Sequence, residues 1–242
     1  MLTIVIPTKN EEAFLPNLLS SLQRQTHQPQ TVIVADADST DRTREIARAF
    51  GAQVVGGGLP GKGRNVGAAI AQTPYVLFLD ADVELTDDHA LEDMMGEMLE
   101  RDLDVATFDV EPLSGAAFVD RVMHAAYNRY ARTLGSLFPH APGFCILARR
   151  DLHEKIGGFD ESVRFCEDHD YAHRAAEHGS LGFLSVRIPV STRRFERDGR
   201  VAVAFKYVLA ELHLATLGPI RHEMFEYTFG HHPLREQEKV DR

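Results

Sequence analysis

The sequence predicts an α/β fold: a Rossmann-like, mostly parallel central sheet flanked by helices, with a helical C-terminal extension. Three observations favour it. Short apolar runs alternate with helical patterns through the first third of the 242 residues. The run Tyr75–Leu79 is apolar throughout, which is typical of a strand buried on both faces. Asp36 and Asp80 follow two of these runs, at the sheet edge where open α/β folds bind ligands.

The first third of the chain divides into strands and helices by pattern. We expect strands over residues 2–6, 31–35, 54–55 and 75–79. We expect a helix that opens at Asn10-Glu11-Glu12 and runs to Leu22, one capped by Ser39 or Thr40 that runs to Phe50, and one that starts at Arg64 after a glycine loop over 56–63. Gly51 ends the second helix. This alternation indicates a parallel, doubly wound sheet.

The remaining two thirds have a looser pattern. Helices are expected over about 87–101 and over 118–134, 167–178 and 201–217, and strands over 105–110, 144–148 and 181–188. No internal repeat, low-complexity tract or linker is evident. One domain with a helical C-terminal extension is the simplest division.

Composition limits the function classes. The chain carries 26 basic and 36 acidic residues, a formal net charge of −10, which argues against nucleic acid as a main partner. A phosphorylated ligand would need a metal ion or a local arginine cluster. Cys145 and Cys166 are too few for a disulfide framework, which favours a reducing cytoplasm. We expect neither a leader nor a membrane span, because no apolar segment reaches about 18 residues.

Two carboxylates, Asp80 and Asp82, follow the strand Tyr75–Leu79 with one residue between them. Hard oxygen ligands at the end of a buried strand can hold Mg²⁺ or Mn²⁺, and such an ion typically neutralises a diphosphate. The alternative is a solvated Asp-Ala-Asp turn, and the tripeptide alone does not decide between them. The rest of the chain favours the metal.

Five segments stand in the order of a known family pattern. They are Ile4-Val-Ile-Pro-Thr-Lys-Asn-Glu-Glu12, Asp36-x-x-Ser39-Thr-Asp41, Gly63-Arg-Asn-x-Gly67, Asp80-Ala-Asp82 and Glu167-Asp168-x-Asp170. Together they resemble glycosyltransferase family 2 over about the first 195 residues. The resemblance implies the GT-A fold and transfer of a sugar, with inversion, from a nucleoside-diphosphate donor. It divides the chain into a GT-A domain over 1–198, with a nucleotide-binding half (1–82) and an acceptor half (83–198), and a helical extension over 199–242.

The resemblance assigns the nucleobase side of the site. Pro7 and Thr8 end the first strand and face the base, with Glu11 close by; an ordinary strand-to-helix turn is the alternative. Asp36 can accept the imino N–H of a uracil or guanine. The family often has two consecutive acids here, whereas this chain has Ala37 and then Asp38. Which acid faces the base therefore stays open.

The diphosphate side follows from the same resemblance. Arg64 lies near the nucleotide, where a helix start and a guanidinium both face an anion. Asp82 binds the Mg²⁺ or Mn²⁺ ion through which the diphosphate is held, and Asp80 lies near the ribose or a metal-bound water. Arg193 and Arg194, on a loop after the last strand, resemble the mobile segment that closes over the diphosphate; a solvated basic pair is the alternative.

Asp168 matches the general base of this family. An aspartate in ordinary surroundings is ionised at neutral pH and can accept the proton of an acceptor hydroxyl. Glu167 and Asp170 are candidate contacts to the acceptor or the diphosphate. The alternative is that these acids only stabilise a helix N-terminus through its dipole.

Two further features have several interpretations. Among the twelve histidines, His222 and the pair His231-His232 can supply a metal ligand, but their spacing fits no structural zinc site, so surface histidines are favoured. The helix over 201–217 carries more apolar surface than a lone solvated helix. It covers the core, forms a homodimer interface or lies peripherally on a membrane, and core packing is the favoured interpretation.

The expected function is a metal-dependent, inverting glycosyltransferase, a hexosyltransferase by type, in the cytoplasm or at the membrane periphery. One rival is a nucleotidyltransferase that makes a nucleotide sugar, but such enzymes usually have a glycine-rich loop after the first strand, and this chain has none there. Another is a non-catalytic module that binds a nucleotide sugar. The donor base, the sugar and the acceptor, whether a glycan, a lipid-linked molecule or a small molecule, are not identified by the sequence.

Overall fold

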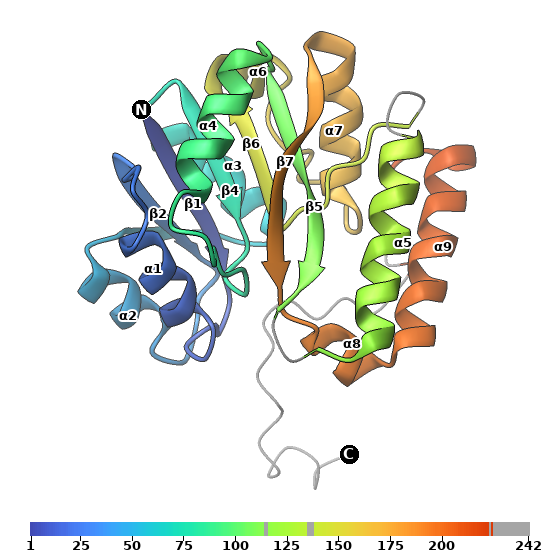
Figure 1. The fold of residues 1–242 in the computed structure, drawn as a ribbon, viewed down its shortest axis with the longest axis horizontal. Helices are drawn as coiled ribbons and strands as arrows, with labels where there is room; N and C mark the ends of the chain where they lie inside the picture. Colours follow the sequence, from blue (N-terminus) through green and yellow to red (C-terminus); the bar gives the residue numbers. More distant parts are fainter. Residues whose placement is uncertain (114–115, 135–137, 223, 225–242) are drawn as a thin grey trace, which may run out of the picture.

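The computed structural model describes residues 1–113, 116–134, 138–222 and 224, and these residues form one seven-stranded sheet with helices around it (Figure 1). The strands are β1 (Leu2–Thr8), β2 (Thr31–Asp36), β3 (Gln53–Gly56), β4 (Tyr75–Leu79), β5 (Val105–Pro112), β6 (Cys145–Arg149) and β7 (Leu181–Val190). Their order in the sheet is β3-β2-β1-β4-β6-β5-β7. The predicted α/β class is confirmed.

The sheet is mostly parallel, with one reversed strand near its middle. β1 pairs in parallel with β2 and β4, and β2 pairs in parallel with β3. β6 runs antiparallel to both of its neighbours, β4 and β5, whereas β5 and β7 are parallel. The carboxyl ends of β1, β2 and β4 therefore share one edge, and the segment that enters β6 starts at that same edge.

Helices cover both faces of the sheet. They are α1 (Leu15–Gln23), α2 (Thr43–Phe50), α3 (Pro60–Ile70), α4 (Ala90–Glu100), α5 (Phe118–Leu134), α6 (Arg150–Lys155), α7 (Glu167–His178), α8 (Arg193–Asp198) and α9 (Arg200–Leu217). Apolar residues of α1, α2 and α4 form one core with the sheet, and those of α3, α6 and α7 form another. Along β1, Ile4 and Ile6 belong to the first core and Val5 to the second, because successive strand side chains alternate.

The first two helices begin later than the sequence predicts. α1 begins at Leu15 rather than directly after β1, and α2 begins at Thr43 without a cap from Ser39 or Thr40. Instead, the loops after β1 and β2 brace each other. The backbone N–H of Asn10 donates to the Ser39 hydroxyl (2.9 Å), and the N–H of Thr40 donates to Oδ1 of Asn10 (2.8 Å). Polar residues that suit a helix cap thus hold two loops together.

Three other elements also differ from the prediction. α3 begins at Pro60, a residue favoured in the first helical turn, so Arg64 is the fifth residue of the helix rather than its start. The helix α6 was not predicted. Residues Arg193–Asp198 form α8, although a loop is the sequence expectation. By contrast, α5 and α7 have the predicted bounds.

The long helices α5 and α9 lie side by side at one end of the molecule (Figure 1). Near their starts, Arg200 donates to both carboxylate oxygens of Asp120 at 2.6 and 2.9 Å. Further along, the Tyr130 hydroxyl donates to Glu211 at 3.3 Å. These two contacts show that the helices run parallel.

One face of α9 is open to solvent. The helix buries Val203, Ala210 and His213, but it exposes an apolar stripe made of Val201, Phe205, Val208 and Leu212. The expectation that the apolar residues of this helix cover the core is therefore wrong for the stripe. Among the described residues, no helix combines the length and the hydropathy needed to cross a bilayer.

An aromatic group with a buried histidine forms part of the second core. The His153 ring centroid lies 5.3 Å from that of Phe78 and 5.7 Å from that of Tyr171, and Nδ1 lies 3.2 Å from the Tyr171 hydroxyl. Burial, reinforced by the charge of Arg174, lowers the pKa of His153 from 6.5 to about 4. The imidazole is therefore neutral in the folded protein at neutral pH.

Gly67→Ala should destabilise the fold, because a Cβ at this position would lie 2.3 Å from Cγ1 of the buried Val5. Overpacking of this kind costs about 1–3 kcal/mol. Gly96→Ala on α4 is the matched control, since no atom lies within 4 Å of the added Cβ and alanine favours a helix by about 1 kcal/mol over glycine. Urea denaturation measures both variants, and equal changes in the free energy of unfolding would contradict the packing argument.

The buried imidazole should also make stability depend on pH. The unfolded chain takes up a proton on His153 near pH 6.5, and the folded chain does so only near pH 4. The free energy of unfolding therefore falls as pH is lowered through this window, by about 2 kcal/mol between roughly pH 7 and pH 5. His153→Phe removes the titrating group and should reduce this loss in urea denaturation. An unchanged pH dependence would exclude His153 as its source.

Candidate functional site

The predicted site residues of the first two strands meet at the shared edge of the sheet. Thr8 and Asp36 end β1 and β2 in register, and the Thr8 hydroxyl donates to Oδ2 of Asp36 at 3.0 Å. Pro7 and Thr8 are both buried, and the Thr8 carbonyl accepts from the N–H of Ala37 at 2.9 Å. The hydrogen bonds of Thr8 therefore join the end of β1 to the end of β2.

Asp36 has little free hydrogen-bonding capacity. Its Oδ1 accepts the backbone N–H of Ser39 at 2.9 Å, its Oδ2 accepts the Ser39 hydroxyl, and Nε of Arg44 lies 3.6 Å away. The carboxylate is 3% exposed. Asp38, by contrast, is exposed and has a positive φ of 56°. The structure thus uses Asp36 to shape the loop after β2 and turns Asp38 to solvent.

Asp80 and Asp82 emerge where β4 ends, as predicted, and each contacts an arginine. Nη2 of Arg64 donates to Oδ1 of Asp80 at 2.9 Å, and Nε of Arg193 lies 3.0 Å from Oδ2 of Asp82. Burial raises the pKa of Asp80 to about 6; Arg64 opposes this shift, and the charge of Asp82 adds to it. The pair is therefore an acidic site whose negative charge is costly without a cation.

Arg64 is the most connected side chain of the site. Its Nη1 donates to Glu167 at 2.8 Å, and its Nη2 donates to the Gly143 carbonyl at 2.9 Å as well as to Asp80. The guanidinium also lies 5.2 Å from the centroid of the Phe159 ring. Arg64 is only 2% exposed. The expected position at a helix start is wrong, because Arg64 lies in the interior of α3 and its side chain contacts other protein groups. Its place near the nucleotide stays a prediction.

Asp168 lies at the start of α7, and Gly143 fixes its position. Oδ2 of Asp168 accepts the backbone N–H of Gly143 at 2.6 Å, and Oδ1 accepts the N–H of His169 at 2.9 Å. A Cβ on Gly143 would lie 2.8 Å from Oδ2 of Asp168 and 3.1 Å from Nη2 of Arg64. Sequence reasoning missed this glycine, although a Pro-Gly pair just before a strand is a usable signal.

Through Gly143 and Arg64, the two acidic motifs form one continuous network. Asp80 binds Arg64, Arg64 binds both Glu167 and Gly143, and Gly143 binds Asp168. The antiparallel entry into β6 makes this possible, because it brings the segment at residue 143 beside the end of β4. A candidate metal-binding edge and a candidate base are thereby held in one rigid arrangement.

Arg193 comes from α8 to the same edge. It donates to both carboxylate oxygens of Glu11, at 2.9 and 3.0 Å, besides contacting Asp82. Its guanidinium lies 4.2 Å from the centroid of the Phe14 ring. Glu11 is buried, and burial raises its pKa although Arg193 opposes the shift. Glu11 thus anchors Arg193 over the acidic edge.

The remaining predicted contacts lie elsewhere. Nη1 of Arg194 donates to the Tyr207 hydroxyl at 2.7 Å, which ties α8 to α9. Asp170 is 9% exposed and pairs with Arg174 at 2.8 Å within α7. Its carboxylate is therefore paired within α7, and its predicted contact with the acceptor or the diphosphate stays a prediction.

The sequence favours surface positions for His222 and the pair His231-His232. His222 is exposed, and His231-His232 lie outside the described residues. Five others are buried, namely His124, His140, His153, His169 and His213. Helical periodicity could have found one of them: the pattern of α7 places His169 on the same face as Ala172 and close to Asp168.

Comparison with known proteins agrees with this arrangement. A family described as "Glycosyl transferase family 2" matches residues 3–157. The chain is similar to 4,4'-diaponeurosporenoate glycosyltransferase of Staphylococcus haemolyticus (strain JCSC1435), 39% identical over 38% of this chain and 26% of that protein. It is also similar to the uncharacterized glycosyltransferase Rv0539 of Mycobacterium tuberculosis (strain ATCC 25618 / H37Rv), 33% identical over 65% of this chain and 72% of that protein.

A solved structure shares the fold. The mannosyltransferase PcManGT from Pyrobaculum calidifontis, in complex with GDP-Man and Mn²⁺, superposes with a TM-score of 0.66 at 20% identity, over 86% of this chain and 64% of that one. The chain spans about a quarter of the length of the staphylococcal relative. The similarity to PcManGT supports the GT-A architecture of the sheet.

Arg64→Gln should destabilise the protein by about 2–3 kcal/mol, because it leaves Asp80, Glu167 and a carbonyl without their shared cation. The loss is below that of a fully buried pair, since the Asp80 side chain is 37% exposed. Arg149→Gln is the control: that arginine is 39% exposed and pairs with Asp151, so its loss should stay below about 1 kcal/mol. Urea denaturation measures both variants. If both lose a similar free energy of unfolding, the buried network does not stabilise the protein more than an exposed ion pair does.

Proposed function

The chain belongs to glycosyl transferase family 2, and we propose that it transfers a hexosyl residue, with inversion, from a nucleoside-diphosphate sugar to an acceptor hydroxyl with the help of Mg²⁺ or Mn²⁺. The observation that carries the proposal is the network that links Asp80 through Arg64 and Gly143 to Asp168. The network supports the proposal because it connects the carboxylates of the proposed metal site to the proposed base, and a displacement reaction requires such groups in a fixed arrangement.

The acidic edge fits a divalent metal ion. Asp82 is 19% exposed, and its Oδ2 is paired with a cationic nitrogen of Arg193. Asp80 is more open and has a raised pKa, so a further positive charge would favour its ionised form. Carboxylate oxygens are the ligands that Mg²⁺ and Mn²⁺ prefer. When bound, the ion would supply charge stabilisation to the departing nucleoside diphosphate.

The chain's own residues would share the work as follows. Asp168 accepts the proton of the acceptor hydroxyl, whose oxygen attacks the anomeric carbon opposite the leaving group. The bond from that carbon to the diphosphate oxygen breaks, and the nucleoside diphosphate takes the electron pair. Arg193 leaves Asp82 when the donor binds and turns toward the diphosphate. Arg64 keeps Asp80, Glu167 and Gly143 in place and acts as a positioning residue.

Several finer properties stay predictions. They are the hexosyl specificity, the cytoplasmic location, and homodimerisation or peripheral membrane contact through residues 201–217. The exposed apolar stripe of α9 supports homodimerisation or membrane contact, because such a stripe is unusual on a surface that binds nothing. The acceptor class is open.

A thermal-shift panel of UDP- and GDP-sugars, with and without Mn²⁺, tests the proposal. One donor should raise the melting temperature only when the metal is present, because a ligand that binds the folded state stabilises it by mass action. Asp82→Asn should abolish the metal-dependent part of the shift. Asp93→Asn, exposed on α4, is the control and should keep it. A nucleotide sugar that stabilises Asp82→Asn as well as it stabilises the natural chain would remove Asp82 from the site.

Asp168→Asn separates donor binding from chemistry. The variant should bind the donor with an unchanged dissociation constant and lose about 10²- to 10⁴-fold in turnover, the usual contribution of a general base. Slow hydrolysis of the donor, in which water replaces the acceptor, provides an assay that needs no knowledge of the acceptor. Normal hydrolysis by the asparagine variant would show that Asp168 is not the base. Release of pyrophosphate from a nucleoside triphosphate and a sugar phosphate would instead identify a nucleotidyltransferase.

A further inference from the structure

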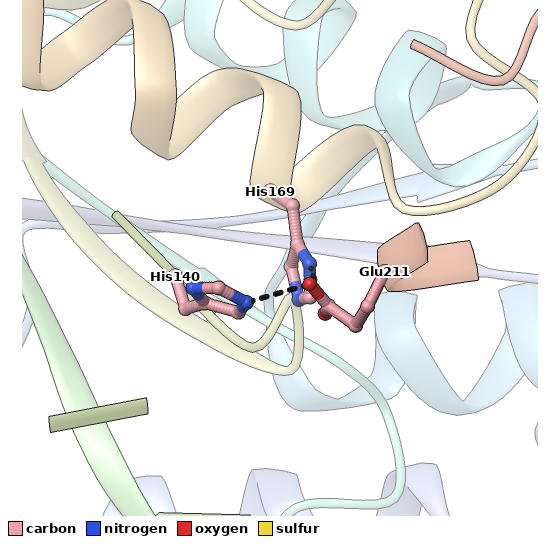
Figure 2. Close-up of side chains that lie close together, drawn as sticks. All are labelled: His140, His169 and Glu211. Carbon is pink, nitrogen blue, oxygen red and sulfur yellow. Dashed lines mark hydrogen bonds and ion pairs between the residues drawn. The ribbon is translucent and has the colours of Figure 1, made fainter. Parts of the chain in front are cut away.

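Two buried imidazoles and a carboxylate, none of them part of the acidic edge at Asp80 and Asp82, lie close together (Figure 2). His140 comes from the segment before β6, His169 from the first turn of α7, and Glu211 from the middle of α9. Nε2 of His140 lies 2.9 Å from Oε2 of Glu211, and Nδ1 of His169 lies 3.1 Å from Oε1. One ligand atom from each residue lies within 4.8 Å of the other two.

The hydrogen bonding of His140 exposes a lone pair to the cluster. Its Nδ1 contacts the backbone carbonyl of Phe138, which can only accept, so Nδ1 carries the proton. In the neutral imidazole Nε2 then has a lone pair, and this lone pair faces the lone pairs of the Glu211 carboxylate at 2.9 Å. Two acceptors at that distance repel each other, and either a proton on Nε2 or a metal ion between the two groups relieves this repulsion. A histidine that binds a metal ion through one ring nitrogen usually donates its other ring N–H to a group such as a backbone carbonyl, as His140 does here.

His169 supplies a second nitrogen without a hydrogen bond. Its Nδ1 is buried, and the 3.1 Å contact with Glu211 does not have the geometry of a hydrogen bond. The side chain is 8% exposed. A polar nitrogen left in this state costs free energy unless another group satisfies it. A metal ion among the three side chains would do so.

The surroundings of the cluster are negatively charged. Glu167 and Asp168 directly precede His169 in the chain, and their carboxylates add negative charge beside the cluster. The Tyr130 hydroxyl also donates to Oε2 of Glu211 at 3.3 Å.

We propose that His140, His169 and Glu211 bind one Zn²⁺ ion, at a site separate from the acidic edge at Asp80 and Asp82. Two histidines and one glutamate are a known zinc ligand set, with a water in the fourth position. Bonds of about 2.0–2.2 Å in a tetrahedron place ligand atoms about 3.3 Å apart. No separation among the three ligand atoms exceeds 4.8 Å, so each must shorten by no more than about 1.5 Å to reach this value.

Such an ion would join three parts of the chain that are distant in sequence. It would fasten α9 to α7 and to the segment that leads into Gly143. His169 follows Asp168 directly, so the ion would also stiffen the turn that carries the candidate base. The zinc site does not depend on the proposed glycosyl transfer, since its evidence lies in His140, His169 and Glu211 alone.

Metal binding by the full chain is measured first. After dialysis against a chelator, Zn²⁺ is added in competition with a chromophoric indicator, and Co²⁺ is added separately to record the visible spectrum. We expect one Zn²⁺ per chain, a Co²⁺ spectrum of tetrahedral type, and a rise in melting temperature of about 5–10 °C at a 100-fold excess of Zn²⁺ over its dissociation constant.

Variants locate the ion. Mutating a group that only hydrogen-bonds to a metal ligand typically weakens metal binding by about 10- to 100-fold. Glu211→Gln and His140→Gln change proposed ligands themselves, so each should weaken Zn²⁺ binding by at least this factor. His213→Gln is the matched control: this histidine is also buried on α9, but it contacts the Gly218 carbonyl. Asp82→Asn should keep full Zn²⁺ affinity, which separates this site from the one in the proposed function. If the natural chain binds no Zn²⁺, or if Glu211→Gln binds as tightly as His213→Gln, the proposal is wrong and the cluster is an ion pair that holds α9.

Discussion

The buried guanidinium of Arg64 is the interaction on which the arrangement of the site depends. A charge 2% exposed inside the protein is stable only when it is paired and hydrogen-bonded. Asp80, Glu167 and the Gly143 carbonyl accept from its two Nη atoms, and they come from the end of β4, from α7 and from the entry into β6. Its Nε has no hydrogen-bond partner among the described residues. None of these groups is placed by local sequence. The three acceptors come together around the guanidinium of Arg64, whose five N–H donors can bind several acceptors at once.

Cations compensate the acidic edge throughout. Arg44 lies near Asp36, Arg64 binds Asp80, and Arg193 bridges Glu11 and Asp82. In a chain with a net charge of −10, this pairing is how several carboxylates coexist at one end of a sheet. It also means that an anionic ligand at this edge competes with carboxylates for the same arginines. A divalent ion that replaces Arg193 at Asp82 would release a guanidinium for that ligand.

Much of the fold was predictable, because apolar strands alternate with helices and buried strands lack polar residues. The ends of β1, β2 and β4 followed from the parallel topology, and with them the positions of Asp36, Asp80 and Asp82. Contacts between distant segments were not predictable. The partners that Arg64 has within the protein could not be predicted, because they lie 16, 79 and 103 positions away in the sequence. Likewise, the periodicity of α9 shows an apolar stripe, but only packing against α5 and α7 decides which side is buried.

The two candidate cation sites differ in chemistry, and this difference predicts different occupants. The edge at Asp80 and Asp82 offers only carboxylate oxygens and reaches solvent, which suits Mg²⁺ or Mn²⁺ that retains water and exchanges with each donor. The cluster of His140, His169 and Glu211 is more deeply buried and offers imidazole nitrogens, which suit Zn²⁺ held permanently. Asp168 lies between them: Gly143 and Arg64 connect it to the first, and the adjacent His169 connects it to the second. Glu167 and His169 flank Asp168 in the first turn of α7, and they contact Arg64 and Glu211 respectively. A substitution at either cation site should therefore alter the position of Asp168 through this turn.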